Sequence, residues 1–443
     1  MIPMRIHWLT LGASLLCALV LASCGGGSHA IVPSTTTSNP ERRRPTPMPS
    51  STPITETPLA LSSFDQSVGI NTHMMYITTP YVDDYSVWSP LLFASRIKHV
   101  RDQICPQVET SWCINVYAGR IRELASHGIH TDFLTTPKDS ASWVDSYVST
   151  LGVADGTEAF EGWNECDVSR QCGSWQTTEA AWQRHLYTLK SPGVTIIGPS
   201  MATSLGYSLL GNLSTSMDVG NIHDYPQNNY PEAAGVTPAR LSWVRATSGN
   251  DPVWSTEDNY STDPTYANYG VPEVVQERYL SRILMEHLRL GVMRTYIYQL
   301  FDYGPDAGQY MGLLHADYTA KPAWTRLDQL MGYLDDAGTS PRTPLRYSLS
   351  GDASGALHHL LFQRSDGTYT LALWIAKSVY SSSSHTILAP TSETVTVSLP
   401  TTFGSATIRH FNDYGQIADE QLTGAAGVFR VPVSSLISVM TAR

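Results

Sequence analysis

Two glutamates each follow a short apolar segment that has the composition of a buried β-strand. Glu165 ends the run EGWNE at 161–165, and Glu257 ends the run WSTE at 254–257. A carboxylic acid that protonates a leaving oxygen, together with a second carboxylate on the opposite face, is the pair of groups that cleaves a glycosidic bond. We therefore take Glu165 and Glu257 as the candidate acid/base and nucleophile.

The elements that would position this pair form a regular series. Between residues 64 and 334, short apolar segments alternate with helix-like stretches, which is typical of repeated βα units around a parallel sheet. The span of about 270 residues fits a (β/α)8 TIM barrel, which typically has about 250 residues. The eight expected strands are 68–71, 97–101, 129–134, 159–164, 194–199, 219–223, 252–256 and 294–300. Strands four and seven stand on roughly opposite sides of such a barrel, so their carboxyl ends can converge across its mouth.

The pattern changes after Gly338 to short alternating runs separated by Gly, Ser and Asp. The runs 357–362, 369–374, 394–399 and 406–411 predict an antiparallel β-sandwich over 339–443, behind a barrel over 61–338. None of them forms a catalytic constellation. The sandwich is expected either to stabilise the barrel by packing on it or to act as a carbohydrate-binding module.

The strand-end residues resemble clan A of the glycoside hydrolases, whose barrels carry an Asn-Glu acid/base on strand four and a Glu nucleophile on strand seven. The runs EGWNE and WSTE look most like family 39, with the family 5 group close behind. The resemblance extends over the eight strands and the sandwich. Family 39 tends to have Pro after the acid/base, where this chain has Cys166 and Asp167. The resemblance implies a retaining glycosidase that cleaves a poly- or oligosaccharide by double displacement and uses no cofactor or metal.

Other positions match the clan residue by residue. Arg101 falls where the clan keeps an Arg that holds the nucleophile ionised, as a neighbouring guanidinium does to a carboxyl group. The run His-Asp-Tyr at 223–225 resembles the clan's His-x-Tyr, which implies that Tyr225 donates to Glu257 and that His223 contacts sugar. Asn164 would hold the hydroxyl next to the reacting carbon. The remaining expected contacts are Tyr298 on strand eight and Asn71 and His73 after strand one.

Nearby acidic and aromatic residues are assigned other roles. Glu161 shares the strand parity of Glu165 but lies four residues earlier, so we expect it to point into the barrel interior. Asp167 and Asp258 lie just past the strand ends and are expected to orient loops. Aromatic side chains in the post-strand loops could stack on sugar rings, and the candidates are Trp88, Trp112, Trp175, Tyr260, Tyr303 and Tyr310.

Three other functions remain open at this stage. A barrel that binds carbohydrate without cleaving it would not need both glutamates, and a transglycosylase would use the same two residues. A metal-dependent hydrolase is disfavoured because Asn71-Thr72-His73 stands after strand one, where a His-x-His pair would be expected. The sugar, a β-pyranoside or an arabinofuranoside, and the choice between internal and terminal cleavage also stay open, as does the oligomeric state.

The first residues predict export and attachment to a membrane. Arg5 precedes an apolar stretch at 9–22 and the sequence LASC, so residues 1–23 are expected to be a signal peptide. LASC resembles the lipobox of bacterial lipoproteins, which implies lipidation of Cys24, and Gly25 points to the outer membrane. Ordinary cleavage after Ser28-His29-Ala30 is the alternative. Residues 24–60, rich in Pro, Ser and Thr, are expected to be a disordered tether.

Net charge and cysteine spacing bear on the partners, disulfides and metal sites that the chain can have. The chain has a formal net charge of −11 and no basic block beyond residues 42–44, so we expect no nucleic-acid partner. Outside the leader four cysteines remain, and three pairings are possible. Sequence proximity favours two local disulfides, Cys105 with Cys113 and Cys166 with Cys172. Neither spacing is that of a zinc site.

Overall fold

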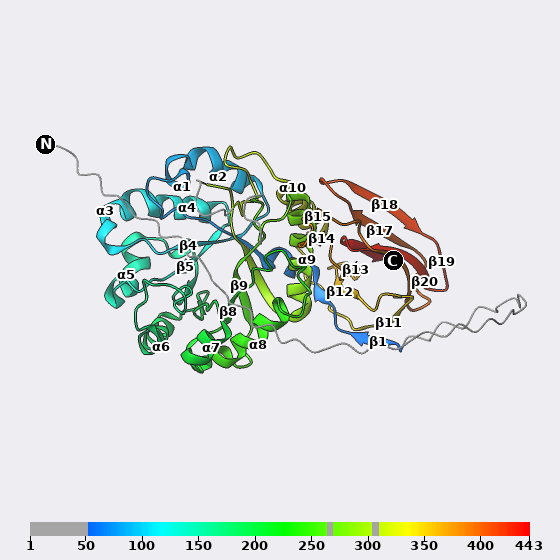
Figure 1. The fold of residues 1–443 in the computed structure, drawn as a ribbon, viewed down its shortest axis with the longest axis horizontal. Coiled ribbons are helices and arrows are strands. Elements are labelled where there is room, and N and C mark those ends of the chain that lie inside the picture. Colours follow the sequence, from blue (N-terminus) through cyan, green and yellow to red (C-terminus); the bar gives the residue numbers. More distant parts are fainter. Residues whose placement is uncertain (1–51, 264–268, 304–309) are drawn as a thin grey trace, which may run out of the picture. The chain divides into compact units, whose positions relative to one another are not determined.

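The structure is a computed structural model of the 443-residue chain that describes residues 52–263, 269–303 and 310–443 (Figure 1). The predictions for residues 1–51, including the signal peptide, the lipidation of Cys24 and most of the tether, lie outside the described residues. Within the part that the structure describes, no helix has the length and apolar character needed to cross a membrane.

Eight parallel strands form the barrel, and each lies within a few residues of its expected position. Neighbouring strands hydrogen-bond in the order β7-β6-β5-β4-β3-β10-β9-β8. A parallel bridge between Ile197 and Val219 joins the two ends of this series. The strands are β3 (Val68–Asn71), β4 (His99–Gln103), β5 (His130–Leu134), β6 (Thr157–Glu161), β7 (Thr195–Ile197), β8 (Gly220–His223), β9 (Val253–Asp258) and β10 (Val292–Ile297).

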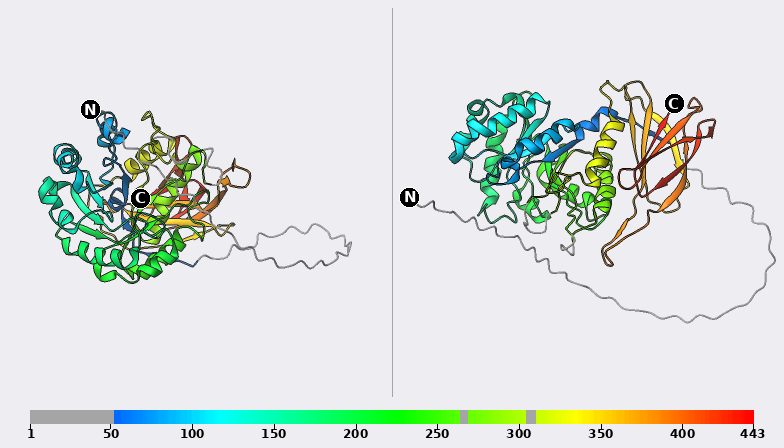
Figure 2. Two further views of the ribbon diagram at one scale, coloured as in Figure 1. Left: turned by 60° about the vertical axis from the view of Figure 1, so that its left-hand side comes forward. Right: turned by 90° about the horizontal axis from the view of Figure 1, so that it is seen from above.

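Helices surround this barrel as an outer ring, which the left view of Figure 2 shows. The longer helices bury one apolar face; in α4, for example, Ile121 and Leu124 are buried while Glu123 is exposed. The helices are α1 (Pro80–Asp83), α2 (Tyr85–Ala94), α3 (Thr110–Trp112), α4 (Ala118–Ser126), α5 (Ala141–Leu151), α6 (Trp175–Leu186), α7 (Ser204–Leu210), α8 (Thr237–Ser248), α9 (Glu273–Leu290) and α10 (Pro322–Leu334). A π-helical turn over Cys113–Tyr117 leads directly into α4.

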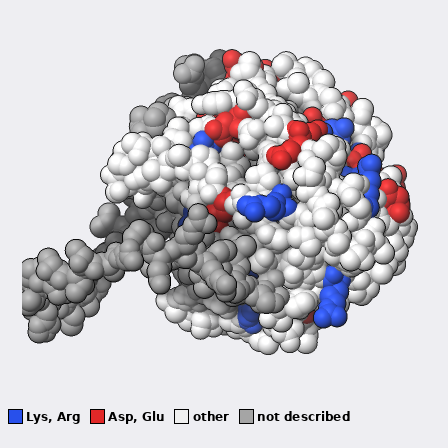
Figure 3. All heavy atoms as spheres, turned by 90° about the vertical axis from the view of Figure 1, so that its right-hand side faces the viewer, with Lys and Arg blue, Asp and Glu red and all other residues white. Residues whose placement is uncertain are grey.

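Two mainly antiparallel sheets form the C-terminal part, in the orders β1-β11-β16-β20-β19 and β18-β17-β21-β13-β12-β2. Side chains from both sheets share one apolar core, which includes Tyr347, Leu373, Val397 and Phe429. The surface seen in Figure 3 carries isolated charges of both signs among uncharged side chains. The strands are β1 (Ile54–Glu56), β2 (Leu59–Ala60), β11 (Leu345–Ser350), β12 (Leu357–Gln363), β13 (Tyr369–Ile375), β16 (Ser392–Ser398), β17 (Ala406–Phe411), β18 (Ile417–Leu422), β19 (Gly424–Ala425), β20 (Val428–Ser434) and β21 (Ser438–Ala442), with a hairpin of β14 (Tyr380–Ser381) and β15 (Thr386–Ile387). The predicted barrel and C-terminal antiparallel β-structure are confirmed.

The predicted boundary of the tether at residue 60 is wrong, because residues 54–60 form part of these sheets. β1 pairs with β11, and β2 pairs with β12. The Tyr347 hydroxyl donates to Glu56 Oε2 at 2.5 Å, which fixes β1 in place. Two short edge strands need little apolar surface of their own when a finished sheet offers them free backbone groups. A Pro-rich composition therefore gave no sign of this pairing.

Candidate active site

Arg101 on β4 organises the interior of the barrel just below its carboxyl end. Its five N–H donors are all used: two bind the carboxylate of Glu161 at 2.6 and 2.8 Å, and one reaches Glu257 Oε1 at 2.6 Å. The other two bind the amide oxygens of Asn71 at 3.0 Å and Asn164 at 2.9 Å. Burial opposes its charge, but the carboxylates of Glu161 and Glu257 hold the pKa of Arg101 above its usual value. One cation thus joins residues from four strand ends.

Glu161 is the inner member of this network and is fully buried, as its strand parity predicts. Besides the two bonds from Arg101, its Oε1 accepts from Asn221 Nδ2 at 2.9 Å and lies 3.1 Å from the Thr256 hydroxyl. A buried carboxyl group needs several donors to offset the loss of its hydration, and Glu161 has them. Glu161 therefore anchors the guanidinium whose other edge faces Glu257.

Glu257 points into the barrel mouth because β9 bulges at its end. Ile222 pairs with Ser255, but the next residue of β8, His223, pairs with Glu257, so Thr256 is the extra residue. Strand alternation would send neighbours to opposite faces, yet Thr256 and Glu257 both point inward. A bulge is a known means of re-aiming one side chain of a strand. It lets β9 supply Thr256 to the inner network and Glu257 to the mouth.

Both oxygens of Glu257 are bound by donors. Arg101 holds Oε1, and the Tyr225 hydroxyl donates to Oε2 at 2.7 Å. Burial raises the pKa of Glu257, but the charges of His223 and Arg101 and the hydrogen bonds from Tyr225 and Arg101 outweigh it and lower the pKa to about 2. With 13% of its side chain exposed, Glu257 is an ionised, oriented carboxylate that solvent can still reach.

Glu165 lies just past β6 and takes an unusual backbone conformation, with φ at +46°. A non-glycine residue adopts this left-handed region only when its surroundings hold it there. Its amide N–H donates to the Ser200 carbonyl at 3.0 Å, and the next residue, Cys166, is bonded to Cys172. Its side chain is 27% exposed. The chain thus turns sharply at this point and presents the carboxyl group to the mouth of the barrel.

His223 lies between the two glutamates. Its Nδ1 is 2.7 Å from Glu165 Oε1 and 3.7 Å from Glu257 Oε2, and its Nε2 is 3.1 Å from the Thr256 hydroxyl. Burial lowers the pKa of His223, but the two carboxylates outweigh this effect and raise it above its usual value. Both ring nitrogens therefore have partners within the protein, whereas the sequence had suggested that His223 contacts sugar.

The remaining expected contacts fall into two groups. Asn71 and Asn164 face Arg101, which fixes the orientation of both amides. Tyr298 and His73 belong instead to an aromatic group, since their rings meet edge to face at 5.3 Å. His73 is almost wholly buried, and burial lowers its pKa to about 4, so its ring is neutral near pH 7.

Three of the six aromatic residues predicted as possible sugar platforms are buried in the core, whereas Trp112 and Tyr310 are not. Trp88, Trp175 and Tyr260 are buried in the packed core, so their faces are unavailable for stacking. Tyr303 does approach the site, with its ring 6.1 Å from that of His73. Tyr76, which was not foreseen, stacks on His73 at 4.6 Å and is 38% exposed. The sequence could have indicated Tyr76, because it lies three residues after His73 in the same loop.

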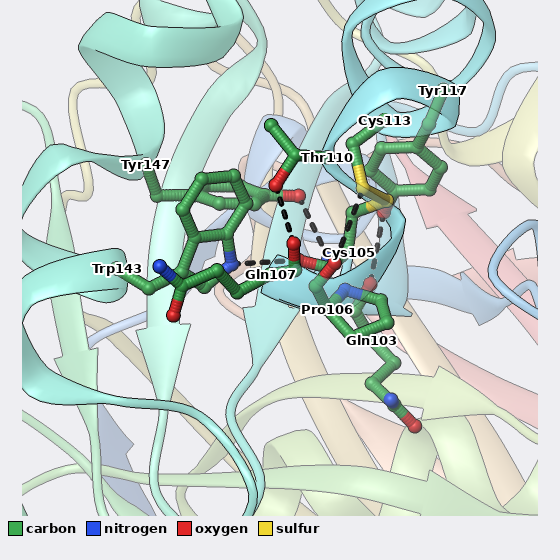
Figure 4. Close-up of a disulfide and its surroundings, with 9 residues drawn as sticks. All are labelled: Gln103, Cys105, Pro106, Gln107, Thr110, Cys113, Tyr117, Trp143 and Tyr147. Carbon is green, nitrogen blue, oxygen red and sulfur yellow. Dashed lines mark hydrogen bonds between the residues drawn. A yellow bond between two sulfur atoms is a disulfide. The ribbon is translucent and has the colours of Figure 1, made fainter.

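Both predicted disulfides are present. The bond between Cys105 and Cys113 closes the loop that follows β4 (Figure 4). Around it the Trp143 indole donates to the Cys105 carbonyl at 2.8 Å, and the Cys105 amide donates to the Tyr147 hydroxyl at 3.0 Å. The strand that carries Arg101 therefore leaves the barrel through a tightly held loop.

Two groups of carboxylates and a histidine among the described residues have the spacing of metal ligands. Glu232, Glu286 and His358 lie away from the mouth, and Arg282 and Arg289 already neutralise the two glutamates. Asp224, Asp258 and His287 lie behind the candidate site. Neither group includes Glu165 or Glu257.

No family model and no curated protein matches this sequence. Solved structures do match its fold. A glucosidase from Croceicoccus marinus is similar with a TM-score of 0.55 and 12% identity, over 88% of this chain and 100% of that one. An α-L-arabinofuranosidase from Thermotoga maritima is similar with a TM-score of 0.57 and 9% identity, over 89% of this chain and 100% of that one. These similarities show that the chain has the fold of glycoside hydrolases in which a barrel is joined to a β-domain.

Proposed function

We propose that the protein is a retaining glycoside hydrolase in which Glu257 is the nucleophile and Glu165 the acid/base. The observation that carries this proposal is the different environment of the two carboxyl groups. Arg101 and Tyr225 bind both oxygens of Glu257 and keep it ionised, while Glu165 faces it with only His223 between them. A double displacement needs this division between an ionised group and a proton carrier.

The separation of the two groups supports retention of configuration. Glu165 Oε1 and Glu257 Oε2 lie 2.7 and 3.7 Å from the same nitrogen of His223, so the sum of these distances, 6.4 Å, is an upper limit on their separation. Carboxyl groups are about 5–5.5 Å apart in retaining enzymes and about 6.5–9.5 Å apart in inverting ones. The shorter arrangement leaves no room for a water between Glu257 and the sugar.

The reaction follows in two steps. Glu257 attacks the anomeric carbon while the bond to the leaving oxygen breaks and Glu165 gives that oxygen its proton. A covalent glycosyl-enzyme and a free alcohol result. Glu165, now a carboxylate, then takes a proton from water as the water oxygen attacks the anomeric carbon and the bond to Glu257 breaks. The sugar leaves with its original anomeric configuration.

His223 is placed to supply the proton that the first step consumes. Its Nδ1 is within hydrogen-bond distance of Glu165, and its raised pKa keeps the imidazole protonated at a higher pH than a free histidine. The proton shared by His223 and Glu165 can therefore move onto the carboxyl group when a sugar enters and displaces solvent.

A carbohydrate substrate is consistent with the similar solved structures, which include a glucosidase and an arabinofuranosidase. We propose that the substrate is a glycan with an O-glycosidic bond and that purified residues 52–443 should be screened on aryl glucosides, aryl arabinofuranosides and polysaccharides. Attachment to a membrane through lipid on Cys24 is a separate proposal, which the LASC motif alone supports.

Substitution of each glutamate tests the assignment. Glu257→Ala should lower kcat roughly 10^4-fold or more on every substrate, and azide should restore activity as a glycosyl azide of opposite anomeric configuration. Glu165→Ala should lose cleavage of natural glycans by roughly 10^2–10^4-fold but keep it on aryl glycosides whose leaving group needs no proton. Glu420→Ala, an exposed acid on β18, is the matched control.

Proton NMR of the first product measures the stereochemistry directly. An initially inverted anomer would rule out double displacement, and a fully active Glu257→Ala would remove the assignment of the site. Absence of turnover on any glycan, with measurable binding, would leave a carbohydrate-binding barrel. Transfer to an added alcohol in preference to water would identify a transglycosylase.

A further inference from the structure

A cluster of three ionisable groups lies directly behind the proposed site. Asp224 and Asp258 extend from the ends of β8 and β9, and His287 reaches them from α9. Both aspartates are 0% exposed and His287 is 1% exposed. This cluster lies on the outer side of the strands, towards the helices. Asn221 and His223 of β8 face the barrel interior, so strand alternation directs the next residue, Asp224, to the opposite side. The proposed two-step reaction uses none of these three groups.

One imidazole connects the two aspartates. His287 Nε2 is 3.2 Å from Asp224 Oδ2 and 3.4 Å from Asp258 Oδ2. Its other nitrogen, Nδ1, is 2.7 Å from the Thr295 hydroxyl on β10, which sets the orientation of the ring. The three strands that end beside Glu257 are therefore linked through a single side chain of the outer helix layer.

Each aspartate directly follows a residue of the site. Asp224 comes after His223, and Asp258 comes after Glu257. The backbone supports the same connection, since the Asp224 amide donates to the Glu257 carbonyl at 3.1 Å. Glu257 also sits at the bulge of β9, where regular pairing is interrupted and the strand needs another constraint. Asp258 is the first residue after the bulge that can provide one.

The charges in the cluster explain why the imidazole is needed. Burial, with the charge of Asp224, raises the pKa of Asp258 well above its usual value, and Arg240 on α8 offsets this only in part. Two unpaired carboxylates at this depth would repel each other and be poorly solvated. The His287 ring stands between the two carboxyl groups, with Nε2 3.2 Å from Asp224 Oδ2 and 3.4 Å from Asp258 Oδ2.

We propose that His287 is a positioning residue, which holds Asp224 and Asp258 and thereby fixes the strand ends that present His223 and Glu257. The inference rests on the proposed glycosidase function for its catalytic readout. A displacement of about 1 Å in a reacting group can cost roughly 100-fold in rate. The cluster therefore acts on catalysis through geometry, without touching the sugar.

The test compares His287→Gln with His99→Gln. His99 is an equally buried histidine, ion-paired at 2.7 Å with Glu158, but it lies at the start of β4, at the other end of the barrel. His287→Gln should lower kcat on the order of 10–100-fold with little change in KM, because Glu257 is displaced without loss of a sugar contact. His99→Gln should leave kcat near the wild-type value in protein of equal folded fraction. Equal losses in the two variants would overturn the proposal.

The acid side of the pH profile gives a second readout that a purely structural role would not move. If Glu257 loses its alignment with Arg101 and Tyr225, its pKa rises from about 2, and kcat/KM of His287→Gln falls at a higher pH than in the wild type. Carbon-13 NMR titration of the side-chain carboxyl groups follows the same change without any substrate. If the pKa of Glu257 is the same in His287→Gln and in the wild type, the inference is overturned, even when no glycoside is cleaved. A wild type without activity on any glycoside would contradict the proposed function only.

A double-mutant cycle checks that His287 acts through the aspartate. The variant His287→Gln/Asp258→Asn should be no slower than the slower single variant, because both changes break the same link. Multiplied losses would contradict the proposal. Should His287→Gln fail to fold, Thr295→Val removes only the hydroxyl at Nδ1 and should give a smaller loss in kcat. If the purified protein retains one equivalent of divalent metal and loses it together with activity on chelation, the three residues form a metal site and the proposal is overturned.

Discussion

His223 lies between the two glutamates, 2.7 Å from Glu165 Oε1 and 3.7 Å from Glu257 Oε2, and in the proposed reaction it is the proton source. An imidazole beside two carboxylates gains stability when protonated, which explains the rise in its pKa in spite of burial. The contact of His223 with sugar stays a prediction, and the structure adds its contacts with Glu165 and Thr256. His223 links the acid/base to the nucleophile electrostatically.

The alkaline side of the pH profile should report this role. Because the pKa of His223 is raised, the wild type should keep kcat/KM to a pH above 6.5 and lose it as the pH rises through the folded-state pKa of His223. His223→Gln should lower kcat/KM roughly 10–100-fold and shift or remove this alkaline limb. Initial rates on an aryl glycoside from pH 4 to 10 measure both effects.

His73→Gln is the matched control for that experiment. His73 lies in the same region, but its pKa of about 4 keeps it neutral across the alkaline range. Its replacement can lower the rate by disturbing the aromatic group around Tyr298, yet it should leave the alkaline limb where it was. A limb that stays unchanged in His223→Gln, or moves equally in His73→Gln, would assign the titration to another group.

At the scale of single elements, sequence predicted the positions of the strands but not the local irregularities. Each barrel strand carries a few buried apolar residues between helix-like stretches, so all eight could be recognised although strands such as β4 and β8 also contain polar residues. Arg101 and Tyr225 could be placed beside Glu257 only through the resemblance to clan A, because β3 and β10 separate β4 from β9 in the strand order. The bulge at Thr256 could not be foreseen, since strict alternation would send Thr256 to the face opposite Glu257. Likewise, Trp88 and Tyr260 lie near strand ends in sequence but are buried by helix packing, which no single-sequence pattern specifies.

Helix α6 contains a residue that conflicts with its surroundings. Glu179 is 0% exposed, and neither of its carboxyl oxygens has a hydrogen-bond partner among the described residues. Burial, with the charge of Asp167, raises its pKa to about 9. Glu179 is therefore protonated in the folded protein near pH 7, although the same group is ionised in the unfolded chain.

Glu179→Gln should consequently stabilise the protein, by an amount that depends on pH. The wild type keeps its full stability below about pH 4.5 and loses it as the pH rises towards 9, because only the folded state retains the proton. At about 1.4 kcal/mol per pH unit, the variant should gain roughly 3 kcal/mol in unfolding free energy at pH 7 and nothing at pH 4. Urea unfolding at pH 4, 7 and 8.5 measures the difference.

The exposed residue Glu109 provides the comparison for Glu179. Glu109→Gln removes the same formal charge at a site open to water, so its effect on stability should stay within about 0.5 kcal/mol at each pH. A gain for Glu179→Gln that does not change between pH 4 and 8.5 would show that packing, not the proton, is responsible.

For the whole molecule, Arg282 on α9 is the central contact between the barrel and the C-terminal sheets. It is fully buried and binds Glu232 through two nitrogens, one of them at 2.8 Å from Oε1. It also donates to the Lys377 carbonyl at 2.7 Å, and the Trp374 indole donates to Glu232 Oε1 at 2.7 Å. A barrel loop, a barrel helix and the sheets are thus tied together at one buried ion pair.

Removing only the cation should therefore destabilise the whole unit. Arg282→Met leaves Glu232 charged and without its main partner, which typically costs about 3–5 kcal/mol, whereas replacing both members is far less harmful. The double variant Arg282→Met/Glu232→Gln should recover much of the lost stability. The more exposed ion pair of Arg409 and Asp419 provides the control, because Arg409→Met should cost less than about 1 kcal/mol. Thermal and urea unfolding followed by tryptophan fluorescence measure all four proteins. A double variant as unstable as Arg282→Met alone would mean that the backbone contact at Lys377, and not the buried charge of Glu232, determines the stability of this junction.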